Sequence, residues 1–155
     1  MHAVPFFLKV PGTDSSSGAT IAWTTYTITG MLHFDGTCLS LQWSGVGSLD
    51  AVTGLDVEST TVALPPEHLI VPLLDIHSLR TVGGWWRPRL ELLASDFSAL
   101  RTVPSEAGGT VRLWLSRRHR DAAKRLVDAV YGAVRSLHPE LGPKPSFGTP
   151  PNGAV

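Results

Sequence analysis

Histidine and cysteine are the residue types that most often carry nucleophilic or metal chemistry, and their placement here favours neither. The chain has six histidines and one cysteine, Cys38. No two histidines lie at i, i+4 spacing in the segment predicted to be helical, and there is no Gly-rich phosphate loop or nucleophile elbow. A metal site formed by His33 and His77, or a reactive Cys38 thiol, is less favoured than ordinary strand positions for these residues. We therefore expect no catalytic residue, no metal site and no cofactor, and we predict that the protein is not an enzyme.

Tryptophan and arginine are the residues whose spacing indicates a function. Trp85, Arg87 and Arg89 alternate along one predicted strand, and Arg112 and Trp114 alternate along another. If the two strands pair, all five side chains share one face. Guanidinium groups stack on indole rings with about 0.5–2 kcal/mol each, and both residue types are enriched in binding hot spots. We predict that these five residues form a binding surface. The alternative is that they only stack on one another as cross-strand pairs, or that the terminal helix or the N-terminal arm covers Trp114.

Charge is unevenly distributed along a chain whose formal net charge is zero. Basic residues concentrate between Arg80 and Arg125 and acids lie mostly earlier, so we expect a dipolar molecule with one basic side. Within that basic region, Arg117, Arg118 and Arg120 lie at the start of the predicted helix, where cations oppose the helix dipole. Their positive charge is balanced either by nearby acids such as Asp121 or by an anionic partner. Zero net charge argues against nucleic acid as a partner.

Hairpins and one terminal helix are the elements that must position these side chains. Asp35-Gly36 between alternating apolar runs predicts a β-hairpin, and Gly83-Gly84 predicts a tight two-residue turn into a strand over 85–93. Local composition predicts a strand over 19–34 with a bulge or a sharp coil at Gly30, a Gly-rich loop over 44–54, and a strand over 55–64 ended by Pro65-Pro66. It also predicts an edge strand or bulge over 68–74, a helical turn over 95–101 capped by Ser95 or Asp96, and a strand over 110–115.

The segment Arg117–Leu137 is predicted to be the one long helix. Its apolar residues recur at spacings of three and four, Ser116 precedes it as a possible cap, and His138-Pro139 ends it. The apolar stripe consists of Ala122, Ala123, Leu126, Val127, Val130, Ala133, Val134 and Leu137. We therefore predict a mainly β fold of about seven antiparallel strands, whose open end is covered by this C-terminal helix.

The two ends of the chain are predicted to lie outside one domain that spans residues 20–137. Residues 1–19 are expected to form an extended arm and a flexible loop; the apolar run Val4–Val10 either packs on its own domain, which is the favoured interpretation, or binds a partner. Residues 138–155 are rich in Pro and Gly and are expected to be a disordered tail. The single cysteine and the lack of a recognisable signal or membrane segment predict a cytoplasmic location.

Three segments, in this order, resemble bacterial pleckstrin-homology-like (PH-like) domain proteins: FDGTCLSLQW, HLIVPLLDIHSLRTVGGWWRPRLELLA and GGTVRLWLSRRHRDAAKRLV. The resemblance covers roughly Gly30 to Leu137. It implies a partly open barrel of seven strands capped by a C-terminal helix, a binding or scaffolding role, and no common catalytic residue. Phosphoinositide-binding members carry basic residues around the first hairpin. Here no Lys or Arg lies between Lys9 and Arg80, which argues against that ligand.

The leading functional hypothesis is therefore a non-catalytic PH-like module that binds a protein segment or, weakly, an anionic surface. The second is a structural or oligomerisation domain in which an edge strand at Leu69–Leu74, or the arm Val4–Val10, pairs with a second copy. The third, a carrier of a small apolar ligand, is disfavoured because a barrel of this size is normally filled by its own side chains.

Overall fold

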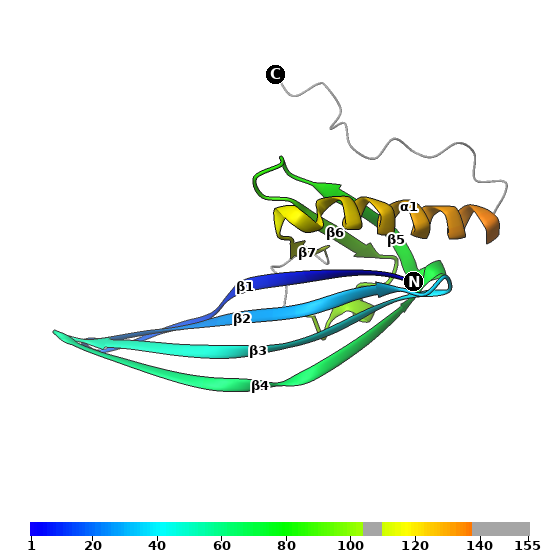
Figure 1. Ribbon diagram of the computed structural model, residues 1–155. Coiled ribbons are helices and arrows are strands. Elements are labelled where there is room, and N and C mark those ends of the chain that lie inside the picture. Colours follow the sequence, from blue (N-terminus) through cyan, green and yellow to red (C-terminus); the bar gives the residue numbers. More distant parts are fainter. Residues whose placement is uncertain (104–109, 138–155) are drawn as a thin grey trace, which may run out of the picture.

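A computed structural model describes residues 1–103 and 110–137, apart from the side chains of Thr13 and Phe97. The described chain forms one antiparallel sheet with the strand order β4-β3-β2-β1-β7-β6-β5 (Figure 1). Its strands are β1 (His2–Ser17), β2 (Thr20–Phe34), β3 (Cys38–Thr53), β4 (Asp56–Pro72), β5 (Ile76–Val82), β6 (Arg89–Ala94) and β7 (Thr110–Trp114). The helix α1 (Arg120–Leu137) follows, and three short 3₁₀ turns lie at Leu73–Asp75, Phe97–Leu100 and Arg117–His119. The predicted mainly β class with one C-terminal helix is confirmed.

The sheet is open, because β4 and β5 are edge strands that do not meet. Its long strands β1–β4 form one section and its short strands β5–β7 a second, joined through the pair Phe7 and Trp114. The helix α1 lies on the same side of the long section as β5–β7, while the far halves of β1–β4 extend beyond them (Figure 1). The helix covers one half of an open sheet.

The core lies between the near half of the long section, the short section and α1. Alternate residues of each strand enter it, as the periodicity predicts: Leu32 and Phe34 precede the Asp35-Gly36 turn, and Leu39 and Leu41 follow it, all buried. The helix contributes the centre of its predicted stripe; its buried residues are Ala123, Leu126, Val127 and Val130. Leu137, at the end of that stripe, is exposed.

The N-terminal segment is a strand in place of the predicted arm and flexible loop. Val4, Phe6 and Leu8 are buried in the core, so the favoured interpretation of Val4–Val10 as part of its own domain is confirmed. The Gly/Ser/Asp-rich continuation pairs with β2 as far as Ser17, after a register shift between Pro11 and Asp14. Pairing along a neighbouring strand overrides a composition that by itself favours a loop.

Two further predictions about strand ends are wrong. Residues 44–53 are a continuous part of β3, and the hairpin turn to β4 lies at Gly54, whose φ is +63°. Pro65-Pro66 do not end β4, which runs on to Pro72. They lie opposite a register shift between Trp43 and Gly45. Proline is tolerated there because β4 is an edge strand and needs no N–H on its free side.

Gly30 is not a bulge but a point of close approach. It pairs with Phe6 on one side and Trp43 on the other without a shift in register. A Cβ at this position would lie 2.5 Å from the Phe6 ring and 2.4 Å from the Gln42 carbonyl oxygen. Glycine is needed because the Phe6 ring covers its backbone.

The two predicted helical segments are present, with small changes. Asp96 caps the 3₁₀ turn Phe97–Leu100 by accepting a hydrogen bond from the Ser98 N–H, as one of the two predicted caps. The terminal helix begins with the 3₁₀ turn Arg117–His119, and Ser116 makes no side-chain cap bond. Among the described residues, no helix is long and apolar enough to cross a membrane. The predicted disordered tail, 138–155, lies outside the described residues.

Candidate binding surface

The hairpin between β5 and β6 has a longer turn than predicted. β5 ends at Val82 and β6 begins at Arg89, so Trp85 and Arg87 belong to the connecting loop and not to a strand. Gly83 has a φ of +91°, and a Cβ there would lie 2.4 Å from the Arg87 carbonyl oxygen. Pro88 has no N–H to give to the ladder, so regular pairing starts one residue later. The prediction of a tight turn is therefore wrong, although the hairpin itself is present.

The end of this loop carries two exposed indoles and a guanidinium group, which we call the tip: Trp85, Trp86 and Arg117. The indole centroids are 4.0 Å apart, and 54% and 60% of the two side chains is exposed. The Arg117 Cζ lies 3.9 Å from the Trp86 ring centroid and 4.9 Å from that of Trp85. Its Nε also donates to the Trp86 carbonyl oxygen at 3.4 Å. The tip therefore holds its two large apolar side chains in the solvent by stacking them on a cation.

A backbone hydrogen bond brings the two segments of the tip together. The Leu115 N–H donates to the Pro88 carbonyl oxygen at 3.0 Å, which fixes the end of β7 beside the end of the β5–β6 loop. Arg117 follows two residues later and reaches back over the indoles. The contact therefore depends on tertiary structure and has no local sequence signal.

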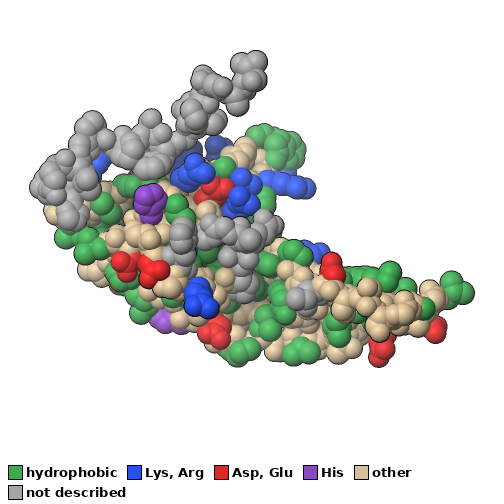
Figure 2. All heavy atoms as spheres, turned by 180° about the vertical axis from the view of Figure 1, so that it is seen from behind, with side chains coloured by type: hydrophobic (Ala, Val, Ile, Leu, Met, Phe, Trp, Pro, Cys, Tyr) green, Lys and Arg blue, Asp and Glu red, His purple; other side chains and the backbone are tan. Residues whose placement is uncertain are grey.

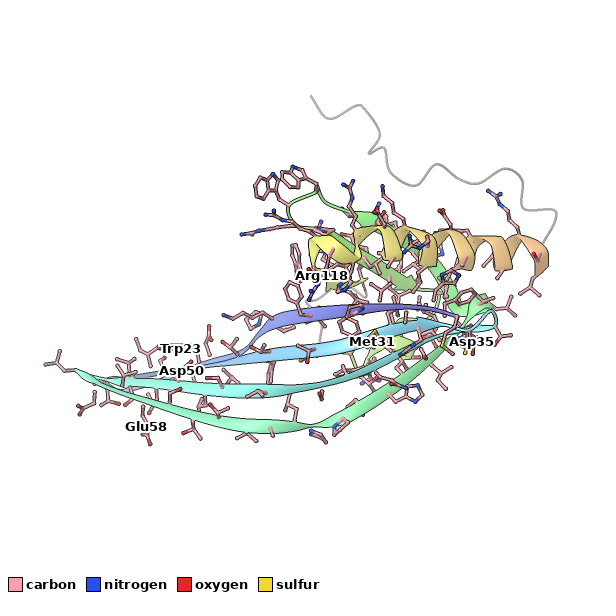
Figure 3. All side chains as sticks on the ribbon, in the orientation of Figure 1. Trp23, Met31, Asp35, Asp50, Glu58 and Arg118 are labelled. Carbon is pink, nitrogen blue, oxygen red and sulfur yellow. The ribbon has the colours of Figure 1, made fainter. Side chains whose placement is uncertain are left out.

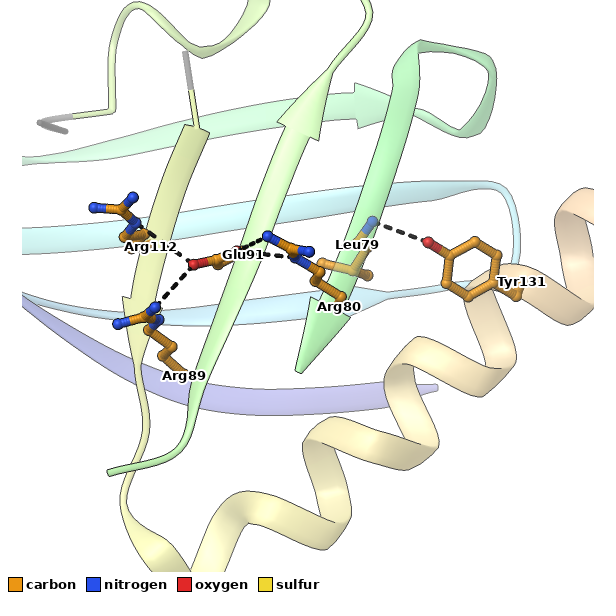
Figure 4. Close-up of polar contacts among 6 residues, drawn as sticks. All are labelled: Leu79, Arg80, Arg89, Glu91, Arg112 and Tyr131. Atoms are coloured by element: carbon orange, nitrogen blue, oxygen red, sulfur yellow. Dashed lines mark hydrogen bonds and ion pairs between the residues drawn. The ribbon is translucent and has the colours of Figure 1, made fainter. Parts of the chain in front are cut away.

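A second group of side chains surrounds Glu91 in the middle of β6, and we call it the Glu91 cluster (Figure 4). Glu91 is buried, with 7% of its side chain exposed, and it contacts three arginines from three strands. Its carboxylate oxygens lie 2.7 Å from Arg80 Nη2, 3.2 Å from Arg89 Nη2 and 3.5 Å from Arg112 Nε. The register produces this group directly, because Glu91 pairs with Arg80 on one side and Arg112 on the other. One carboxylate thus contacts three guanidinium groups.

The predicted pairing of β6 with β7 is confirmed, and it brings three of the five predicted site residues together. Arg89 pairs with Trp114, and Arg112 lies on the same face beside Glu91. The Arg89 Cζ lies 5.4 Å from the Trp114 ring centroid. Trp114 is half-buried beside β1. The predicted alternative of a cross-strand stack is therefore observed for this pair.

The other two predicted residues lie in the loop, and Arg87 is exposed and forms no ion pair with any residue of 1–103 or 110–137. Sequence reasoning missed Glu91, Arg80 and Trp86. Alternation and hairpin counting would have placed the first two beside Arg89 and Arg112, because cross-strand neighbours follow from register. Sequence reasoning named Arg117 as part of the basic helix start but did not predict its stack on the two indoles.

Charge is separated in space as well as along the chain. Figure 2 shows Lys and Arg side chains gathered over the short strands and the helix start, and acidic side chains along the extended half of the long section. That half carries Asp14, Asp50, Asp56 and Glu58, and no Lys or Arg. Asp121 lies in the first turn of α1, close in sequence to the basic run Arg117–Arg120. The structure therefore agrees with the expected dipolar distribution.

Other positions offer less chemistry. The residues described form no group of three or more His, Cys, Asp or Glu side chains that could hold a metal ion. The Cys38 thiol donates to Asp35 Oδ2 at 3.4 Å, and burial together with this carboxylate raises its pKa, which disfavours a reactive thiolate. A shallow hollow of about 390 Å³ lies over the bulge of β3 and β4, and no charged side chain lines it.

Comparison with known proteins identifies no relative. The chain matches no family model, and neither the curated proteins nor the solved structures include one that is significantly similar to it.

Proposed function

We propose that this protein is a non-catalytic binding module of the PH-like type, and that it binds an acidic protein segment through the tip and the adjoining Glu91 cluster. The observation that carries the proposal is the tip itself, where two exposed indoles are held on a guanidinium group. Exposed aromatic and arginine side chains of this kind are typical of binding hot spots. The strand order and the C-terminal helix agree with the resemblance to bacterial PH-like proteins, and the single cysteine supports a cytoplasmic location.

The charge of this surface selects the partner. The Glu91 cluster places three arginines beside the tip, and Arg87 and Arg117 add exposed positive charge next to the indoles. An acidic segment with apolar side chains matches both features, since carboxylates pair with guanidinium groups in bidentate geometry. An anionic lipid surface offers the same charge without pockets for the two indoles, and we propose it only as a weak second ligand.

Peptide selection tests this proposal. A displayed library of random peptides is selected on the full chain, and the selected peptides are titrated against wild type, Trp85→Ala/Arg87→Ala and the control Arg135→Ala on the far end of α1. We expect acidic, apolar peptides, with a dissociation constant raised about tenfold or more by the tip substitutions, equivalent to about 1.4 kcal/mol, and unchanged by the control. Peptides without acidic residues, or equal binding to the tip variant, would contradict the proposal. Sedimentation with phosphatidylglycerol and phosphatidylcholine vesicles measures the lipid alternative.

The alternative of an oligomerisation domain that pairs through a strand has less support. The arm Val4–Val10 is paired with β2, and Phe7 also with β7, so its exchange requires opening the core. β4 is a free edge with Ile70 exposed, but Pro65, Pro66 and Pro72 limit the hydrogen bonds that this edge can donate. Extension of the sheet through Leu69–Leu74 is therefore disfavoured.

A further inference from the structure

The far half of the long section, residues 12–25 of β1–β2 and 46–63 of β3–β4, is uncovered. No described helix or strand lies over either of its faces (Figure 1). We call this part the distal sheet. Six of its apolar side chains are between 37% and 71% exposed: Ile21, Trp23, Val46, Leu49, Val57 and Val62. Extended apolar sheet faces of this kind are rare on monomers and are typical of interaction sites.

One face of the distal sheet places an indole between two carboxylates. The cross-strand register runs from Asp14 through Trp23 to Asp50, and the next row runs from Ile21 through Val52 to Val57. Asp50 is oriented by the Ser59 hydroxyl, which donates to its Oδ1 at 2.6 Å. Trp23 and Asp50 lie on the extended half, far from Arg118 at the helix start (Figure 3). We call this the Trp23 face.

The negative charge on the Trp23 face disfavours an interface between the Trp23 faces of two copies. The only charged side chains of the distal sheet are acidic, so two Trp23 faces brought together would oppose carboxylates of like sign. A complementary partner presents positive charge next to apolar surface. The tip of the same protein has this chemistry, with Trp85 and Trp86 beside Arg87 and Arg117.

We propose that the tip of one copy docks on the Trp23 face of a second copy. In this arrangement the indoles of the tip cover Ile21 and Trp23, and Arg87 lies between the two carboxylates. The inference rests on the proposed function, because it names the occupant of that same tip as the acidic, apolar distal sheet of another copy. The contact joins two different surfaces, so it is heterologous and extends into a chain or closes into a ring.

Complementation between two variants tests this arrangement. The tip variant is Trp85→Ala/Arg87→Ala and the sheet variant is Trp23→Ala/Asp50→Ala; all four side chains lie outside the core, and circular dichroism verifies folding. By light scattering coupled to size exclusion at low salt, we expect wild type to form dimers and larger species as concentration rises into the millimolar range. Each variant alone stays monomeric. An equimolar mixture forms one-to-one heterodimers and nothing larger, because only one competent interface remains.

Exchanging the two charges that are proposed to face each other gives a second test, which needs only one substitution on each surface. D50K and R87E each weaken association about tenfold or more, and one chain that carries both recovers it, since the facing charges are exchanged. Association of wild type also weakens as salt rises, as expected for exposed ion pairs. The substitution Asp56→Lys, at the start of β4 and outside the Trp23 face, serves as the control and leaves association unchanged.

Three results would overturn the inference: a wild type that stays monomeric at millimolar concentration, a mixture of the two variants that stays monomeric, or self-association that both variants retain. The proposed function fails separately. If copies stay monomeric while selected acidic peptides still bind wild type and not the tip variant, the tip is a binding surface for another protein and only this inference is lost.

Discussion

The two halves of the long strands differ in what covers them and hardly at all in how they pair. β2 and β3 are paired without interruption from Phe34 and Leu39 at one end to Thr20 and Thr53 at the other. In the near half, alternate side chains enter a core beneath α1 and the short strands; in the distal sheet, the same alternation leaves apolar side chains exposed on both faces. Backbone pairing therefore sets the extent of the sheet, and the covering layer sets the extent of the core.

The acidic residues of the two regions also differ in their burial and in their charged neighbours. Around the core, the acid Glu91 on the outer face of β6 is buried and meets three arginines. In the distal sheet, Asp50 on the inner strand β3 accepts hydrogen bonds from the hydroxyls of Ser48 and Ser59. Glu91 is therefore an acid compensated by ion pairs, whereas Asp50 forms no ion pair with any of the described residues.

The largest expected effect comes from a matched pair of substitutions on β3. Leu41 is fully buried, and Leu49, on the same face of the same strand, is 47% exposed. We expect Leu41→Ala to lower the free energy of unfolding by about 2–5 kcal/mol, because it leaves a cavity in the core. Leu49→Ala should change it by about 0.5 kcal/mol or less. Urea unfolding followed by circular dichroism measures both. Equal losses would show that the distal sheet is covered in solution and would break the comparison.

Sequence predicts the near half well because its signals are local. The Asp35-Gly36 turn fixes the β2–β3 register within a few residues, and the three- and four-residue spacing of α1 predicts its buried stripe. In the distal sheet, the strands predicted over 19–34 and 55–64 are confirmed in β2 and β4. The parts of β1 and β3 that pair with them were missed, because their Ser, Gly and Asp residues have the composition of a loop. Such residues form strands here because a neighbouring strand pairs with them, and that information is not local.

In the candidate surface, too, the part that depends on strand alternation was predicted and the part that depends on tertiary structure was not. Arg89, Arg112 and Trp114 meet because cross-strand neighbours follow from alternation once two strands are correctly paired. The length of the β5–β6 loop and the stack of Arg117 on Trp86 depend on how β7 ends beside that loop, which no spacing within the sequence encodes.

A pair of carboxylate substitutions sharpens the comparison with a smaller expected effect. Glu91→Gln removes the charge that three arginines share, and we expect a loss of about 1–3 kcal/mol in the free energy of unfolding, reduced from the value for a fully buried pair because the arginines are partly exposed. Asp50→Asn should change it by about 0.5 kcal/mol or less. Thermal and urea unfolding at neutral pH measure both. Equal effects would contradict the conclusion that only one of the two acids is compensated.

The smallest expected effect concerns the turns at the two ends of β3. At the core end, Asp35 accepts hydrogen bonds from the backbone N–H of Cys38 and Thr37 and from the Thr37 hydroxyl, and these bonds hold its pKa well below the usual value. A lowered pKa in the folded state means that the carboxylate contributes stability above its ordinary pKa and loses that contribution as pH falls through the folded value.

We therefore expect Asp35→Asn to lower the melting temperature most at neutral pH, with the difference from wild type shrinking as the pH drops below about 4. The matched control is Asp56→Asn at the opposite turn, where no hydrogen bond from a neighbouring backbone N–H to the side chain is present in the described chain, and its effect should be smaller at every pH. Calorimetric melting of both variants between acid and neutral pH measures the two profiles. A difference for Asp35→Asn that grows toward acid pH would show that the turn is not fixed by its carboxylate.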